Sequence, residues 1–291
     1  MHQDFSAYSH KTIYYLFYKV LQIIFLFCSI LFCTSEVFAQ QMTDKPFVVV
    51  LDAGHGGHDS GNRGNGYFEK KIALNIVLKI GKQLEKLPGV KVIYTRKTDV
   101  FVELIQRANI ANKADADLFV SVHCDAFTSP KAFGAGTFVL GLHANDRNFK
   151  VAQKENAVIF LEDDYEQNYD GFNPNDPESV ISLILMQETY LDQSIEAAGA
   201  IQKSFVSNLK RKDRTVKQAG FVVLKYTYMP SVLVETGFLT NKSEGSFLNS
   251  SKGQSNMSNA IAKAIINYKH LREASIQELF SYESSHEIKP A

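Results

Sequence analysis

Apolar and polar positions repeat along this chain with two different periods, and the two periods alternate. The β-branched run over residues 47–51 predicts a buried strand, and apolar positions that recur every three or four residues over 69–87 predict a helix. Pro88 and Gly89 end that helix. The alternation continues with a strand, a helix and a strand, over residues 90–95, 102–114 and 117–123. This order predicts an α/β fold whose mostly parallel central sheet is flanked by helices within a single domain.

The second half of the chain interrupts the pattern with a polar stretch. Residues 143–177 include the acidic run 162–164 and a turn-rich segment, and a long helix is predicted after them over 178–209. We interpret residues 143–193 as an insertion into the domain. The remaining pattern predicts a last helix over 253–271 and three more strands, over 136–140, 221–225 and 231–235. The tail, 273–291, has no clear pattern.

The first residues have the organisation of a secretory signal. Lys11 and Lys19 precede a nearly uninterrupted apolar run over 20–33, and Val37 and Ala39 then form the Val-x-Ala pattern that suits signal peptidase. The apolar run is short for a membrane span, which needs about 20 residues. We therefore expect a signal peptide over 1–39, a domain over 40–272, export to the periplasm or cell envelope, and no stable membrane span after cleavage. An uncleaved membrane anchor is the alternative.

Composition narrows the function further. Lys and Arg together number 31, as do Asp and Glu, so the chain lacks the basic excess typical of nucleic-acid binding, and we expect no nucleic-acid partner. Cys28 and Cys33 lie within the predicted signal, which leaves Cys124 as the single cysteine of the mature chain. No intramolecular disulfide is then possible, and stability must come from the core or from a metal.

Ionisable residues follow the ends of several predicted strands. His55 comes just after the first strand, while His123 and Glu235 each close a later one. In open α/β sheets, sites form beyond the carboxyl ends of the strands, so these side chains can converge. Glu69 opens the first helix, and the glycine-rich loop over 54–66 can bring it to the same edge.

Two imidazoles and one carboxylate form a frequent catalytic zinc set that leaves one position open for water. A further carboxylate that does not bind the metal can move protons. Each residue also has a structural interpretation: a single histidine is more often structural, Glu69 suits the positive end of a helix dipole, and Glu235 can be a paired charge. From the pattern alone, a metal site and a purely structural arrangement remain equally open.

Other candidates for chemistry are less favoured. We interpret His58 and His143 as ordinary structural or surface histidines. Cys124 follows His123 in a strand and should point to the opposite face, which favours a small buried side chain over a metal ligand or a nucleophile. Residues 54–57 do not form a phosphate-binding loop, because no Gly-x-Gly-x-x-Gly or Gly-Lys-Ser/Thr pattern follows a strand.

Taken together, the chemically distinctive segments resemble the zinc-dependent N-acetylmuramoyl-L-alanine amidases, amidase type 3. The resemblance is carried, in the family's order, by residues 50–57, 69–75, 95–99, 107–109, 116–123 and 230–238. It extends from residue 47 to about 270. The chain departs from the family pattern at residue 68, where a basic residue is often found, and at Cys124, where alanine is common.

The resemblance implies a fold of the phosphorylase/hydrolase-like type and a specific reaction on peptidoglycan. The family cleaves the amide between the lactyl group of N-acetylmuramic acid and the L-alanine of the stem peptide. Carried over by position, His55, Glu69 and His123 would bind Zn²⁺, and Glu235 would act first as general base and then as general acid. Arg96 and Arg107 also match family positions, and we assign both to structural ties between helix and loop.

The insertion adds an expectation about regulation. In some family members an inserted helical segment covers the zinc until a partner protein displaces it. We expect the region 148–193 to gate the cleft, with an acidic residue such as Glu162, Glu178 or Glu188 competing for the open position on the metal. A solvated acidic surface loop is the alternative.

Two other functions remain to be separated from the amidase reaction. A zinc peptidase or deacetylase that acts on another amide can share the same metal ligands, because these ligands determine the reaction type more than the substrate. A non-catalytic wall-binding module is the rival from another class, although the presence of Glu235 beside a complete ligand trio speaks against it.

Overall fold

We describe the chain from a computed structural model, which covers residues 15, 17–26, 45–141, 146–169, 171–176 and 188–286. The chain divides into two units, Met1–Pro46 and Phe47–Ala291. In the first unit, residues 17–26 are helical, and the predicted cleavage site after Ala39 lies outside the described residues. Among the described helices, none combines the length and the apolar character that crossing a bilayer requires.

A six-stranded sheet forms the centre of the second unit, and its strand order is β4-β1-β5-β8-β6-β7. All neighbouring strands are parallel except β6 and β8. The sheet is therefore mostly parallel, as the alternation of strands and helices predicted. In chain order its strands are β1 (Phe47–Ala53), β4 (Val90–Tyr94), β5 (Leu118–Asp125), β6 (Ala135–Leu140), β7 (Asp213–Ala219) and β8 (Ser231–Phe238).

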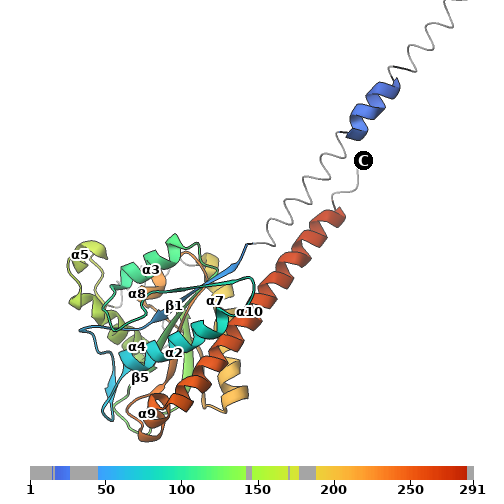
Figure 1. Cartoon of the computed structure of the whole chain (residues 1–291). Helices are drawn as coiled ribbons and strands as arrows, with labels where there is room; N and C mark the ends of the chain where they lie inside the picture. The colour runs from blue at the N-terminus through green and yellow to red at the C-terminus, as the bar shows by residue number, and fades with distance from the viewer. Residues whose placement is uncertain are drawn as a thin grey trace, which may run out of the picture. The chain divides into compact units, whose positions relative to one another are not determined.

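Helices cover both faces of this sheet (Figure 1). One face packs against α2 (Glu69–Leu84), α7 (Glu188–Leu209) and α10 (Ser251–His286). The other face packs against α3 (Leu104–Lys113), α8 (Val222–Lys225) and α4 (Asp146–Asn156). Alternate residues of β1 enter the two cores, which is why this strand reads as a continuous apolar run.

The structure corrects one predicted strand and adds another. Residues 221–225 were predicted as a strand, but Val222–Lys225 form the short helix α8. Val222, Val223 and Leu224 are all buried, and a short run buried on every side cannot be assigned to strand or helix from periodicity. Asp213–Ala219 form the edge strand β7, which was not predicted because its first six residues are exposed or only partly buried.

Helical boundaries also differ from the prediction. The last helix, α10, runs to His286 rather than ending near Leu271, and a separate helix, α9 (Lys242–Asn249), precedes it. The description of α7 begins at Glu188, so its predicted start at residue 178 lies outside the described residues. Within the predicted insertion, the described elements are α4, the 3₁₀ helix η1 (Ala157–Leu161), α5 (Tyr165–Asn168) and the first residues of α7.

The carboxyl ends of β1, β5 and β8 meet at one edge of the sheet, because these three strands are neighbours and parallel. The register pairs Ala53 with Val122, and His123 with Glu235. A small hairpin of β2 (Arg63–Gly64) and β3 (Tyr67–Phe68) joins the first strand to α2. This edge is where the predicted site residues come together.

Candidate active site

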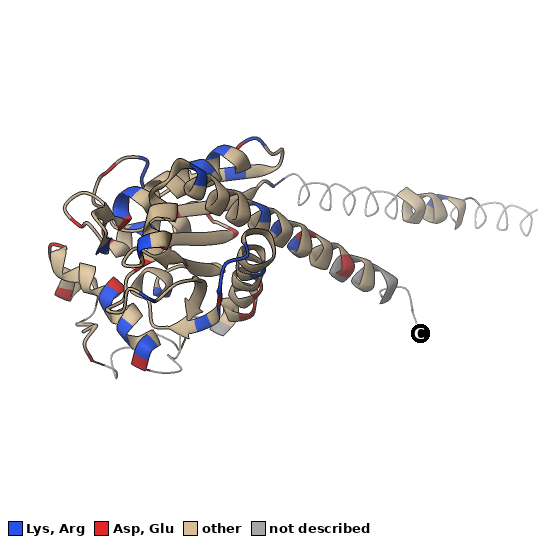
Figure 2. Cartoon of the chain, turned by 90° about the horizontal axis from the view of Figure 1, so that it is seen from below, with Lys and Arg blue, Asp and Glu red and all other residues tan. Residues whose placement is uncertain are grey.

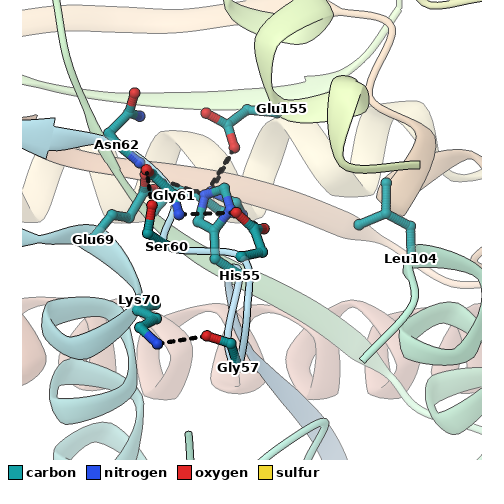
Figure 3. Close-up of polar contacts among 12 residues, drawn as sticks. His55, Gly57, Ser60, Gly61, Asn62, Glu69, Lys70, Leu104 and Glu155 are labelled. Carbon is teal, nitrogen blue, oxygen red and sulfur yellow. Dashed lines mark hydrogen bonds and ion pairs between the residues drawn. The ribbon is translucent and has the colours of Figure 1, made fainter. Parts of the chain in front are cut away.

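Four side chains from separate elements converge at this edge. One nitrogen or oxygen atom from each of His55, Glu69, His123 and Glu155 lies within 4.8 Å of the corresponding atoms of the others. In Figure 3, Glu69 and Glu155 approach His55 from different elements. The structure thus brings together the three predicted metal ligands and adds Glu155, which the sequence did not predict.

Glu69 occupies the middle of this cluster. Its Oε2 is 3.1 Å from Nε2 of His55, and its Oε1 is 3.1 Å from Nδ1 of His123. The carboxylate is fully buried and accepts hydrogen bonds from the backbone N–H groups of Asn62 and Cys124, each at 2.7 Å. Glu69 is the first residue of α2, as predicted, but its backbone contacts fix the side chain toward the histidines.

Glycines give the histidine rings their space. A side chain at Gly54 would place its Cβ 2.4 Å from Cε1 of His123, and one at Gly61 would place its Cβ 2.5 Å from Cδ2 of His55. His55 itself has a positive φ of 59°, which is uncommon for residues other than glycine and is tolerated where the surroundings fix the backbone. The glycine-rich loop was expected to bring Glu69 to this edge; the structure adds that Gly54 and Gly61 leave room for the two imidazoles, which larger residues would displace.

In each imidazole, the ring nitrogen that faces away from Glu69 and Glu155 contacts a polar side chain. Nδ1 of His55 is 2.7 Å from Oδ2 of Asp59, which leaves Nε2 facing the carboxylates. Nε2 of His123 is 3.1 Å from Oγ of Ser121, and that hydroxyl donates to Oδ2 of Asp52 at 2.6 Å. Hydrogen bonds of this kind fix the tautomer and orientation of metal-binding histidines.

The charges of the cluster fit a bound cation. Burial disfavours the charged form of His123, but the carboxylates of Glu155 and Glu69 outweigh it and raise its pKa to about 9. Burial also opposes the charge of His55, yet Glu69 and Glu155 raise its pKa well above the usual value. Burial likewise disfavours the charged form of Glu69, but His55 and His123 together outweigh it, so that the pKa of Glu69 falls well below its ordinary range. The carboxylates of Glu69 and Glu155 therefore favour a positive charge at the centre of the cluster.

The donor atoms also suit a divalent metal such as zinc. Two imidazole nitrogens and carboxylate oxygens are among the ligands that zinc takes. Nε2 of His55 and Oε2 of Glu155 are buried and lie 3.1 Å apart, yet neither makes a well-formed hydrogen bond among the described residues. A buried polar atom without a partner is costly, and a cation between these atoms would remove that cost. The residues present therefore fit a metal ion.

Glu235 lies beside the cluster but is not one of its four donors. Its side chain is 3% exposed, and both carboxylate oxygens are buried without a hydrogen-bond partner in the described part of the chain. Burial, and then the carboxylates of Asp125 and Glu155, raise the pKa of Glu235 well above its usual value. A carboxylate with a raised pKa next to a metal centre is suited to taking up and releasing a proton.

The structure corrects the prediction of which acidic residue of the insertion lies at the four-residue cluster. Glu162 lies away from the histidines, where its carboxylate accepts hydrogen bonds from Leu104 N–H and from the Tyr169 hydroxyl. Glu178 and the side chain of Glu188 lie outside the described residues. Instead Glu155, near the end of α4, places its Oε2 3.0 Å from Nδ1 of His123 and 3.1 Å from Nε2 of His55.

The sequence carries no clear signal for Glu155. Asn148, Ala152, Glu155 and Asn156 are the buried residues of α4, spaced as one face of a helix. Only one of these four is apolar, so hydrophobic periodicity does not reveal the buried face. Acidic clustering drew attention instead to the run 162–164, which is more exposed at two of its three positions.

The remaining candidates have structural surroundings. The thiol of Cys124 is buried in the core, 3.2 Å from Oγ1 of Thr236, as its position in the strand predicted. Arg107 pairs with Asp52 at 2.8 Å, whereas Arg96 donates to backbone carbonyls, among them those of Ala53 and Gly54. Both arginines tie the loop after β1 to the fold, although only Arg107 does so through a carboxylate.

Of the two histidines interpreted as structural or surface residues, the structure describes His58, which does not join the cluster. The ring of His58 packs against that of Phe101, with centroids 4.1 Å apart. His143 lies outside the described residues.

Comparisons with known proteins agree with this geometry. The sequence model of a family described as N-acetylmuramoyl-L-alanine amidase matches residues 49–267. The chain is 36% identical over 229 residues to the N-acetylmuramoyl-L-alanine amidase AmiA of Escherichia coli K12, which covers 77% of this chain and 76% of that protein.

Solved structures show the same fold. An N-acetylmuramoyl-L-alanine amidase from Clostridium difficile 630 aligns with a TM-score of 0.60 at 26% identity, over 78% of this chain and 98% of that chain. The CwlD amidase of Clostridioides difficile, solved in complex with the GerS lipoprotein, aligns with a TM-score of 0.56 at 25% identity, over 77% and 98%. Because the family match spans most of the chain and a relative is more than 30% identical, this chain belongs to the N-acetylmuramoyl-L-alanine amidase family, as its motifs predicted.

Proposed function

We propose that this family member carries out the reaction for which its relatives are named, the hydrolysis of the amide between the lactyl group of N-acetylmuramic acid and the L-alanine of the stem peptide. The observation that carries the proposal is the convergence of His55, Glu69 and His123 beside a buried, unpaired Glu235. This arrangement combines a site for a divalent cation with a separate group that can move a proton.

In this proposal His55, Glu69 and His123 bind Zn²⁺ through Nε2, a carboxylate oxygen and Nδ1. Zinc, when bound, supplies a Lewis acid that polarises a carbonyl and acidifies water. Asp59 and Ser121 hold the two imidazoles in the tautomers that present these nitrogens to the centre. The glycines at positions 54 and 61 leave room for the rings.

Glu235 handles the protons of the reaction. It takes one proton from the water that attacks the lactyl carbonyl carbon, and it delivers a proton to the alanine nitrogen as the C–N bond breaks. The products are a free lactyl carboxylate on the glycan and a peptide that begins with a free L-alanine amine. The burial of Glu235 suits this exchange, because it reduces the cost of the protonated state.

Product analysis tests the proposal. Zinc-loaded protein incubated with purified peptidoglycan should release intact stem peptides with L-alanine at the amino end, and E235Q should abolish release while zinc binding persists. A zinc peptidase would release shortened peptides, and a deacetylase would release acetate. A non-catalytic wall-binding module would bind peptidoglycan and release nothing. Any of these three results would contradict the proposal.

We further propose that α4 gates the centre. Glu155 supplies a carboxylate at the position where an open metal site would hold water or substrate, 3.0 Å from His123 Nδ1. The helix is anchored by Asn156, which donates to the Gly220 carbonyl and accepts from Val222 N–H. Activity would then require α4 to move. The CwlD amidase was solved in complex with the GerS lipoprotein, which makes a partner protein a reasonable agent for such a movement.

Export is proposed from the first 39 residues. Basic residues followed by a short apolar run and Ala39 suit cleavage by signal peptidase, and peptidoglycan lies outside the cytoplasmic membrane. Amino-terminal sequencing of the protein recovered from the cell envelope should begin at Gln40. A chain that keeps its first residues and stays with the membrane would favour an uncleaved anchor.

A further inference from the structure

A groove of about 680 Å³ lies beside the candidate active site. It shares Glu155 with the four-residue cluster, and Asp125, at the end of β5, also lines it. Its volume lies in the range of ligand-binding sites in proteins. The groove therefore adjoins the four-residue cluster at Glu155, and it is large enough to hold a part of the substrate.

Four cations line this groove, and they come from two separate parts of the chain. Arg63 belongs to the β2–β3 hairpin, whereas Arg147, Lys150 and Lys154 belong to α4. The basic positions of α4 are among the residues drawn in blue in Figure 2. The three α4 cations follow the spacing of one helix face, and Glu155 points from a different face into the centre.

None of these four cations forms a salt bridge with any carboxylate in the described part of the chain. Two are nevertheless held in place. Arg63 donates from Nε to the Ser60 hydroxyl at 2.9 Å, and the guanidinium of Arg147 lies 5.0 Å from the ring centre of Phe127. A guanidinium that is fixed but unpaired is suited to bind a carboxylate in a defined orientation.

Acidic residues offset this charge only in part. Three carboxylates also line the groove, those of Asp125, Asp146 and Glu155. Asp125 interacts electrostatically with Lys154, and Glu155 directs its Oε2 at the two imidazoles, 3.0 Å from His123 and 3.1 Å from His55. Because the charge of Glu155 is taken up by the histidines, the lining of the groove keeps an excess of positive charge.

The substrate has its negative charge on one side of the scissile amide. The lactyl carboxyl of the glycan is consumed in the amide, and the N-acetylated sugars carry no charge. The stem peptide, in contrast, ends in a free carboxylate, as any peptide does. We infer that the groove lined by Arg63, Arg147, Lys150 and Lys154 is the subsite for the stem peptide and that it recognises carboxylates of that peptide.

This inference rests on the proposed function, and it adds the orientation of the substrate in the active site. The glycan would extend away from the groove, and the peptide would run through it past Arg63. Three of the cations are on α4, the helix that carries Glu155. Binding of the peptide would therefore bear directly on the position of α4. Arg63 is on the hairpin and would remain in the groove when α4 moves.

Calorimetric titration of the full zinc-loaded chain tests this subsite without any need for catalysis. The probes are a synthetic L-alanyl-γ-D-glutamyl-L-lysine peptide with free carboxylates and the same peptide with all carboxylates converted to carboxamides. We expect the carboxylate form to bind about tenfold more tightly, as one good charge-assisted contact gives. R63Q and K150Q should each reduce this preference, while K252Q, at an exposed position of α10 outside the groove, should keep it.

Equal affinity for the two peptides would overturn the inference, and so would a preference that survives both R63Q and K150Q. The result is independent of the proposed reaction, because no bond is broken in the titration. A chain that hydrolyses peptidoglycan but ignores the carboxylates would keep the proposed function and lose the subsite. A chain that prefers the carboxylate peptide but releases no stem peptide would keep the subsite and lose the proposed function.

Discussion

The carboxylate of Asp59 lies directly behind the imidazole of His55, with Oδ2 2.7 Å from Nδ1. Asp59 is itself fixed, since its Oδ1 accepts a hydrogen bond from Gly61 N–H at 2.9 Å. An acceptor at Nδ1 keeps the proton there and leaves the lone pair of Nε2 directed at Glu69 and Glu155. The contact therefore prepares His55 to be a metal ligand through Nε2.

Replacing Asp59 by asparagine should weaken zinc binding. Partners of this kind typically contribute about 10- to 100-fold in metal affinity, and we expect a loss in that range for D59N. Competition with a chromophoric chelator measures the affinity directly. D192N, at an exposed position of α7, is the matched control and should bind zinc like the unmodified chain. Unchanged affinity in D59N would mean that Asp59 does not orient the imidazole.

Gly54 provides a second test of the site that does not alter any proposed ligand. A Cβ at this position would lie 2.4 Å from Cε1 of His123, so G54A must displace the ring or the loop. We expect a clear loss of zinc affinity together with lower thermal stability. The control is G199A, because Gly199 lies in α7 with no heavy atom within 4 Å of the added Cβ. G199A should stabilise the helix by up to about 1 kcal/mol. Full zinc affinity in G54A would contradict the arrangement around His123.

The parts of the fold that the sequence predicted correctly are those built on strands that are buried on both faces. β1 and β5 have almost no exposed residues, so their apolar runs were evident and their order with α2 and α3 predicted a parallel sheet. The edge strand β7 is partly exposed, so its sequence is mostly polar and does not look like a strand. The short helix α8 has a continuous apolar run because three of its residues are buried, and that run was taken for a strand. Periodicity carries little information in these two cases.

The candidate site was predictable to the extent that its residues follow strand ends. His55 follows β1, and His123 and Glu235 lie in the carboxyl-terminal halves of β5 and β8, which extend to Asp125 and Phe238; the family motifs added Glu69. Glu155 could not be found in this way, because it reaches the centre from an inserted helix with a mostly polar buried face. Its position depends on how α4 packs, which no local pattern in the sequence specifies.

Removing the negative charge of Glu155 should increase basal hydrolysis. In E155Q the side chain keeps its shape but loses its attraction for the imidazoles, so α4 should leave the centre more often. We expect the rate of stem-peptide release without a partner protein to rise roughly 5- to 150-fold, the range of typical coupling free energies. The control is E166Q on the exposed surface of α5, which should keep the basal rate. An equal or lower rate in E155Q would count against gating.

The metal-free chain should lose stability as the pH rises above neutral. The pKa of His123 is about 9 in the folded chain and about 6.5 in an unfolded one, so the folded chain holds more protons in between. This contribution to the free energy of unfolding is fully present below about pH 6.5 and declines as the pH approaches 9. The pKa of Lys217 is lowered to about 8 by burial, then by Arg214, and gives an opposite trend above pH 8.

Urea unfolding between pH 6.5 and 8, with and without zinc, separates the histidine contribution from that of Asp125 and Glu235, whose raised pKa values give a fall of the same sign. We expect the free energy of unfolding to fall across this window in the presence of a chelator, and the fall to become smaller with saturating zinc, because metal-bound imidazoles are neutral. H270N, at an exposed position of α10, should behave like the unmodified chain. The same pH dependence with and without zinc would mean that the metal binds elsewhere.

The central claim is that His55, Glu69 and His123 hold one metal ion beside Glu235. Anomalous diffraction at the zinc absorption edge, from crystals of the full chain grown with zinc, tests it most directly. We predict one strong peak bonded to Nε2 of His55, Nδ1 of His123 and a carboxylate oxygen of Glu69, at about 2.0–2.2 Å. An absent peak, or a peak away from these three side chains, would contradict the account.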